Sequence, residues 1–233
     1  MLIVVSIIIL LIAATNIALY YSGILEIIKS SSYKSFFLLG LYLLQTVILI
    51  LPLIILTKMR YKLRPRDFGF HKMSLRKSLL SAIEGYLLYI GITLVITIIV
   101  LNFDLRIPGY QLPERILPLF GNDIPSIVIA GIIVVAVAPV VEEIFFRGFL
   151  LRTLSNKIGL WAGSAITASV FALFHMQFAS IIPIFILSLI INSLVIRNKS
   201  IYPAIYFHIL NNAIAFVIEI LLVFEVIKIE SII

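Results

Sequence analysis

The chain has 233 residues, of which 62% are hydrophobic and 12% charged, whereas soluble domains are about 45–50% apolar and about 25% charged. A mean hydropathy of +1.20 excludes a water-soluble globule and a disordered chain, and the lack of cysteine excludes a disulfide scaffold. A net charge of +7 is compatible with binding to nucleic acid. The placement of the basic residues instead indicates membrane topology, so we expect no nucleic-acid partner.

Long apolar runs predict an all-α fold, a polytopic bundle of transmembrane helices with a polar site inside the membrane. About 20 apolar residues cross a bilayer, and we expect about seven spans (six to eight), at 2–20, 35–57, 79–101, 126–154, 159–178, 180–196 and 201–224. The first run lacks a basic n-region and a cleavage site, which predicts a retained helix. The run 180–196 is short and contains Pro183, so a re-entrant or distorted helix is an alternative there. We expect residues 1–233 to form a single integral membrane domain.

Basic residues predict the orientation. The segment 58–77 is rich in Lys and Arg, and short basic loops stay in the cytoplasm, where they also contact anionic lipids. Alternation places four further basic residues on that side and five on the other: inside are Arg152, Lys157, Arg197 and Lys199, and outside are Lys29, Lys34, Arg106, Arg115 and Lys228. The bias predicts a cytoplasmic N-terminus and a site that opens toward the cytoplasm.

Few ionisable residues lie within the predicted spans. Each costs at least about 2.5–3.5 kcal/mol on insertion scales and is therefore a functional candidate. The set is Glu84, Glu142, Glu143, Arg147, His175, His208 and Glu219, with Glu225 near a helix end. We interpret Glu84, Glu219 and Glu225 as structural or interfacial residues.

The fourth span carries two adjacent acids and one base, Glu142, Glu143 and Arg147. Glu143 and Arg147 are four residues apart, so they share a helix face and can form an ion pair that braces the helix. Glu142 is rotated by about 100° and lacks this partner. The two carboxylates therefore have different environments, which suggests different roles.

Two later spans each carry a histidine in a motif of spacing i, i+4. The fifth has Phe171 and His175, and the seventh has His208 and Asn212. At about 1.5 Å of rise per residue, Glu142 and these two histidines reach a similar depth together with Asn212. The sequence therefore predicts that three spans deliver a carboxylate, two imidazoles and an amide to one layer on the cytoplasmic side of mid-membrane.

This combination favours hydrolysis by an activated water. A cysteine nucleophile, a Gly-Xaa-Ser-Gly site, intramembrane aspartates and an HExxH pair are all absent from the sequence. Glu142 can act as general base toward water, and His175 can hold that water or share its proton. His208 and Asn212 can donate to a developing oxyanion.

Alternatives to this chemistry remain open. Glu142, His175 and His208 plus a water would make a catalytic zinc site, although we expect no metal or other cofactor. A non-catalytic bacteriocin immunity or binding protein would keep the fold without needing these side chains. A proton-coupled transporter could use them as a relay, but the sequence shows no repeated halves.

The three motifs, Glu142-Glu143-xxx-Arg147, Phe171-xxx-His175 and His208-xxx-Asn212, resemble those of the CPBP family. This family of glutamate-type intramembrane proteases comprises CAAX prenyl endopeptidases and bacteriocin-processing or immunity (Abi) proteins. The resemblance covers a motif-bearing core of about 126–216. It implies Glu142 as the water-activating residue, His175 as its partner, His208 and Asn212 as the oxyanion side, Glu143 and Arg147 as support, and no obligatory metal. The implied substrate is a membrane-bound peptide or a lipidated protein, with prenylated proteins among them; the substrate-binding residues are not implied.

Overall fold

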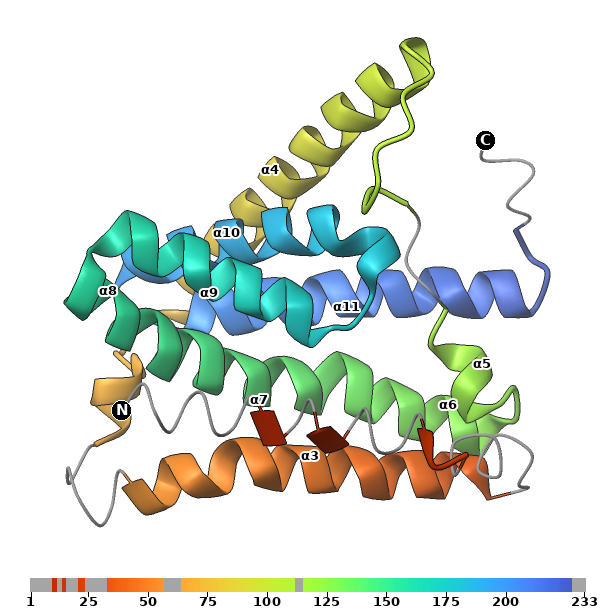
Figure 1. Cartoon of the computed structure of the whole chain (residues 1–233), viewed down its shortest axis with the longest axis horizontal. Coiled ribbons are helices and arrows are strands. Elements are labelled where there is room, and N and C mark those ends of the chain that lie inside the picture. The colour runs from red at the N-terminus through yellow and green to blue at the C-terminus, as the bar shows by residue number, and fades with distance from the viewer. Residues whose placement is uncertain are drawn as a thin grey trace. The chain divides into compact units, whose positions relative to one another are not determined.

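The computed structural model describes residues 10–11, 14–15, 21–23, 33–56, 64–111 and 115–227. These residues form helices and connecting segments without any strand (Figure 1). Five helices in this part of the chain are long and apolar enough to cross a membrane: Lys34–Ile55, Leu75–Asn102, Ile124–Ile158, Phe178–Asn198 and Tyr202–Val223. Leu160–Phe174 is a shorter apolar helix. The all-α prediction is therefore confirmed for the described residues, while most of the expected span 2–20 lies outside them.

The fourth apolar run forms one helical stretch of 35 residues, longer than the expected 126–154. It consists of α6 (Ile124–Gly131), the π-helical segment η3 (Ile132–Val137), α7 (Ala138–Glu143), a second π-helical segment η4 (Ile144–Leu151) and α8 (Arg152–Ile158). Pro139 has no N–H to offer the preceding turn, and the widened turns before it accommodate that loss. π-Helical turns often occur at functional sites, and η4 carries Arg147.

The chain divides into two compact units. The first unit draws on the described parts of 1–62, 115–141 and 209–233. It contains α3 (Lys34–Leu56), α5 (Leu117–Phe120), α6, η3 and the later turns of α11 (Tyr202–Val223). Its buried apolar cluster consists of Leu117, Phe120, Ala130 and Ile133. Burial of these side chains stabilises this unit.

Two acids hold the segment that precedes α6 within the first unit. The carboxylate of Glu219 accepts hydrogen bonds from the backbone N–H groups of Ile116 and Leu117, at 2.7 and 2.8 Å. Asp123 is the N-cap of α6 and accepts from the backbone N and the hydroxyl of Ser126, at 3.0 and 2.6 Å. These bonds from Ser126 lower the pKa of Asp123. Glu219 thus satisfies backbone donors, in keeping with the structural role expected for it.

The second unit comprises the described parts of 63–114 and 142–208. It contains η2 (Pro65–Phe68), α4 (Leu75–Asn102), η4, α8, α9 (Leu160–Phe174), η5 (Phe178–Ser180), α10 (Ile181–Asn198) and the first turns of α11. α9 folds back along α8 after Gly159, whose φ is +88°. A Cβ at Gly163 would lie 2.6 Å from the backbone nitrogen of Ser155, so only glycine permits this close approach. α10 then lies beside α9 (Figure 1).

α10 is a continuous α-helix rather than the distorted segment that was one alternative for this run. Pro183 lies in its first turn, where the backbone N–H has no intrahelical partner to lose.

The connection from α9 into α10 is fixed by backbone hydrogen bonds to the segment that ends at residue 111. The N–H of Gln111 donates to the carbonyl of Ala179 at 2.8 Å, and the N–H of Ile182 donates to the carbonyl of Gly109 at 3.0 Å. These bonds anchor the chain just after His175.

Candidate active site

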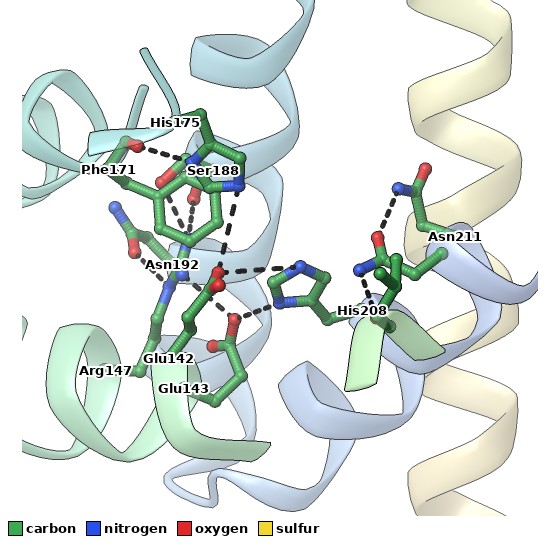
Figure 2. A network of polar contacts seen from close by, with 11 residues as sticks. Glu142, Glu143, Arg147, Phe171, His175, Ser188, Asn192, His208 and Asn211 are labelled. Atoms are coloured by element: carbon green, nitrogen blue, oxygen red, sulfur yellow. Dashed lines mark hydrogen bonds and ion pairs between the residues drawn. The ribbon is translucent and has the colours of Figure 1, made fainter. Parts of the chain in front are cut away.

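The candidate active site lies in the second unit and is organised around a fully buried arginine, Arg147 (Figure 2). Its Nη1 donates to Glu143 Oε1 at 3.0 Å, and its Nε donates to Asn192 Oδ1 at 3.0 Å. Its Nη2 donates to the carbonyl and the hydroxyl of Ser188, at 3.2 and 2.7 Å. The guanidinium carbon lies 4.4 Å from the centre of the Phe171 ring, a cation–π contact. Each of the three guanidinium nitrogens therefore has a hydrogen-bond partner, as a buried cation requires.

Glu143 links Arg147 to the histidine of α11. Its Oε1 accepts from Arg147 and also lies 2.8 Å from Nδ1 of His208, and the Glu143 side chain is completely buried. An ionised carboxylate only accepts hydrogen bonds, so Nδ1 of His208 carries the hydrogen in this contact. Nε2 of the same ring faces Glu142.

The end of α9 orients His175 in the same way. Nδ1 of His175 lies 2.8 Å from the carbonyl oxygen of Phe171 one turn earlier, and a carbonyl can only accept. The hydrogen is therefore on Nδ1, and the Nε2 lone pair points toward Glu142. The next residue, Met176, has a φ of +54°. This left-handed conformation costs free energy for residues other than glycine. This strained turn ends α9 directly at His175.

Glu142 faces both imidazoles. Its Oε2 lies 3.8 Å from Nε2 of His175 and 4.0 Å from Nε2 of His208. Both separations exceed a direct hydrogen bond, and this oxygen is buried without a hydrogen-bond partner among the described residues. Oε2 of Glu142 and the two Nε2 atoms therefore converge on one point, at distances that a bridging water can span (Figure 2).

The structure brings together five of the six residues that the sequence singled out: Glu142, Glu143, Arg147, His175 and His208. The sixth, Asn212, belongs to the first unit. Its Nδ2 donates to the carbonyl of Val134 at 2.9 Å, and its Oδ1 accepts from Asn211 at 3.1 Å. The role of Asn212 in the site stays a prediction.

Sequence reasoning missed the layer of residues behind Arg147. Ser188 and Asn192 of α10 are fully buried and accept from the guanidinium. The amide nitrogen of Asn192 also donates to the carbonyl and hydroxyl of Ser164 in α9, at 3.0 and 3.1 Å. The i, i+4 spacing of Ser188 and Asn192 inside an apolar helix was the available signal, because such a spacing places both side chains on one face.

We expect Asn192→Leu to destabilise the protein by about 1–3 kcal/mol, because Nε of Arg147 and the groups of Ser164 lose buried hydrogen bonds. Thermal unfolding of the purified protein in detergent measures the loss. Ser193→Ala is the matched control, since Ser193 is an exposed residue whose hydroxyl bonds only within its own helix. We expect a change within about 0.5 kcal/mol. Equal melting temperatures for both variants would contradict a supporting role for Asn192.

A zinc site formed by Glu142, His175 and His208 was an alternative from the sequence. Among the residues that the structure describes, no group of three or more His, Asp or Glu side chains is placed to hold a metal ion. The expectation that no cofactor is required stays a prediction and is tested with a chelator below.

The comparisons with known proteins bear on this same segment. Residues 124–214 match the family model described as type II CAAX prenyl endopeptidase Rce1-like, and this range contains all three motifs. Neither the curated proteins nor the solved structures gave a match. With its long apolar helices, the chain is an integral membrane protein. Residues 124–214 are therefore similar to a family of CAAX-protease-type membrane enzymes.

Proposed function

We propose that the protein is an intramembrane endopeptidase in which Glu142 activates a water molecule. The observation that supports this most strongly is the buried Oε2 of Glu142, which has no hydrogen-bond partner among the described residues and is flanked by two imidazole Nε2 atoms. A buried polar atom without a partner costs free energy. Such a cost is reasonable at a point where water or substrate binds during the reaction.

In the proposed first step, Glu142 takes a proton from the water as its oxygen attacks the scissile carbonyl carbon. The O–H bond of the water breaks, a C–O bond forms, and the carbonyl oxygen becomes an oxyanion. Nε2 of His175 accepts the second hydrogen of the water and so orients it. Collapse of the tetrahedral intermediate breaks the C–N bond, and Glu142 returns the proton to the leaving amine.

His208 and Asn212 are proposed to stabilise the oxyanion. An imidazolium His208 donates from both nitrogens, with Nδ1 to Glu143 and Nε2 available to the oxyanion, and the carboxylate of Glu143 stabilises that charge, as in acid–histidine pairs of other hydrolases. Nδ2 of Asn212 carries two hydrogens, and the bond to Val134 uses only one of them. The second hydrogen is the proposed oxyanion donor.

We expect Asn212→Leu to lower kcat by about 10²–10³, the usual effect of removing one oxyanion donor. It should also lower the melting temperature, because the Val134 carbonyl loses its partner. Rates are therefore measured well below the melting temperature of the variant. Asn211→Leu is the neighbouring control, expected to stay within about threefold in kcat because it removes no oxyanion donor. A kcat for Asn212→Leu that matches this control would exclude the oxyanion role.

The proposed substrates are membrane-bound peptides or lipid-modified proteins, cleaved near their C-terminal ends. A peptide in this site must reach a carboxylate within a membrane-spanning helix, so a substrate that is already held at the bilayer has the advantage of proximity. A prenylated protein or a peptide precursor such as a pheromone or bacteriocin fits this description.

A panel of quenched fluorescent peptides, with and without a C-terminal farnesylcysteine, tests the proposal. We expect the purified protein to cleave at least one membrane-anchored member, Glu142→Ala to abolish that cleavage, and a chelator to leave it unchanged. Sensitivity to the chelator would favour the zinc alternative. Full activity of Glu142→Ala, or no cleavage of any anchored peptide, would contradict the proposal and favour a non-catalytic role.

A further inference from the structure

A groove outside the catalytic cluster lies in the second unit, where α4 and α11 begin. Its volume is about 510 Å³. Its lining combines one ammonium group, four hydroxyls and two apolar side chains, from Lys72, Met73, Ser74, Leu75, Ser78, Tyr202 and Tyr206. The groove contains no carboxylate in its lining, so its chemistry suits an anion that accepts several hydrogen bonds.

The local backbone adds to this preference for an anion. Ser74 is the N-cap of α4, a helix of 28 residues, and the first N–H groups of a helix form the positive end of its dipole. Among the described residues, neither the ammonium of Lys72 nor the hydroxyl of Tyr206 has a hydrogen-bond or ion-pair partner. The nearby exposed side chains of Arg76 and Lys77 make the surroundings basic. The hydroxyl of Ser78 already donates to the carbonyl of Ser74 at 3.1 Å. A phosphate group matches the remaining donors, chiefly the ammonium of Lys72 and the hydroxyl of Tyr206, in charge and in acceptor oxygens.

The groove lies where α4 changes from polar to apolar surroundings. The exposed apolar side chains of α4 start at Leu75, which is 60% exposed, and continue with Leu79, Leu80 and Ile83. Since α4 is long and apolar enough to span a membrane, its first turn falls at the level of the headgroups. A ligand with its phosphate in the groove and its acyl chains along α4 contacts both the polar groove and the apolar side chains of α4. A soluble anion contacts only the groove.

The groove and the catalytic cluster use different faces of α11. Tyr202 and Tyr206 are one turn apart and share a face. His208 follows Tyr206 by two residues, a rotation of about 200°, so it points away from the groove and toward Glu142. A peptide bound at Glu142 is therefore not the ligand that the groove accepts.

We propose that this groove binds the phosphate headgroup of an anionic phospholipid, with Lys72 and Tyr206 as the discriminating donors. The proposal is independent of proteolysis, since it uses none of the catalytic residues. It implies that the lipid around the protein is not only a solvent but a specific ligand at the start of α4.

Native mass spectrometry of the full-length protein in a zwitterionic detergent tests this site by titration with dioleoylphosphatidylglycerol. Dioleoylphosphatidylcholine and inorganic phosphate form the two comparison arms. We expect phosphatidylglycerol to bind about tenfold more tightly than phosphatidylcholine. Lys72→Gln should remove most of this preference, and Tyr206→Phe should weaken binding by about threefold or more, the effect of one lost hydrogen bond. Lys77→Gln, the matched control, removes one charge from the same surface outside the groove and should change binding by less than about twofold.

Each variant is first checked for an unchanged melting temperature in the zwitterionic detergent; Lys72 is exposed, so its substitution leaves the fold intact. Equal binding of the two lipids by the wild type would overturn the proposal. Equal losses in Lys72→Gln and Lys77→Gln would also overturn it, because they would show diffuse attraction to a basic surface. Tight binding of inorganic phosphate without a preference between the lipids would assign a free-anion site and overturn the lipid assignment.

Discussion

Replacing Glu142 with glutamine is expected to reduce peptide cleavage to background while the protein still folds and inserts into the membrane. Glutamine has nearly the same shape but cannot take a proton from water, and loss of a general base lowers rates by about 10²–10⁴. Initial rates on a cleaved peptide from the panel, with melting temperature as the check on folding, measure the effect.

Glu84→Gln provides the matched control for this substitution. Glu84 is another glutamate in a spanning helix, but it forms an exposed ion pair with Arg197 at 2.7 Å. Exposed pairs contribute little, so we expect its rate to stay within about twofold of the wild type. A Glu142→Gln variant that cleaves as fast as Glu84→Gln would show that another group activates the water.

Replacing Arg147 with methionine is expected to give the largest loss of stability, about 3–5 kcal/mol. Methionine fills a similar volume but leaves the buried carboxylate of Glu143 without its ion-pair partner, at an oxygen that is completely enclosed. Ser188 and Asn192 lose their donor at the same time. Unfolding in a detergent titration, followed by circular dichroism, measures the loss.

The double variant Glu143→Gln/Arg147→Met separates charge from packing. Removing both charges avoids the isolated carboxylate, and replacing a whole buried pair costs much less than breaking it. We therefore expect the double variant to be more stable than Arg147→Met alone. If the two variants unfold at the same detergent concentration, the ion pair with Glu143 is not the reason that Arg147 stabilises the protein.

Helices were predictable from this sequence because apolar runs end at recognisable residues. The run 35–57 corresponds to α3 (Lys34–Leu56), and the run 201–224 corresponds to α11 (Tyr202–Val223). Gly159 separates α8 from α9 at the expected place, because its φ of +88° stops a helix. The extended fourth helix was less predictable, since the π-helical turns around Pro139 depend on packing as well as on local sequence.

Within the site, the spacing of Glu143 and Arg147 was enough to predict their ion pair, because both lie on one helix. The bond from His208 to Glu143 joins residues 65 positions apart, and no local pattern specifies which carboxylate a distant imidazole meets. The same applies to Asn192, whose contact with Arg147 depends on how α10 packs against η4. Tertiary packing therefore determines the orientation of the His208 imidazole, which sequence spacing alone leaves open.

The most direct test of the central claim is an experimental density map of the protein that resolves ordered water near Glu142. We predict a water within about 3 Å of Oε2 of Glu142 and of Nε2 of His175 or His208. Nδ1 of each histidine should remain bonded as described here, to Phe171 and to Glu143. A map in which the carboxylate and the imidazoles point apart, with side chains or lipid between them, would contradict hydrolysis by a glutamate-activated water.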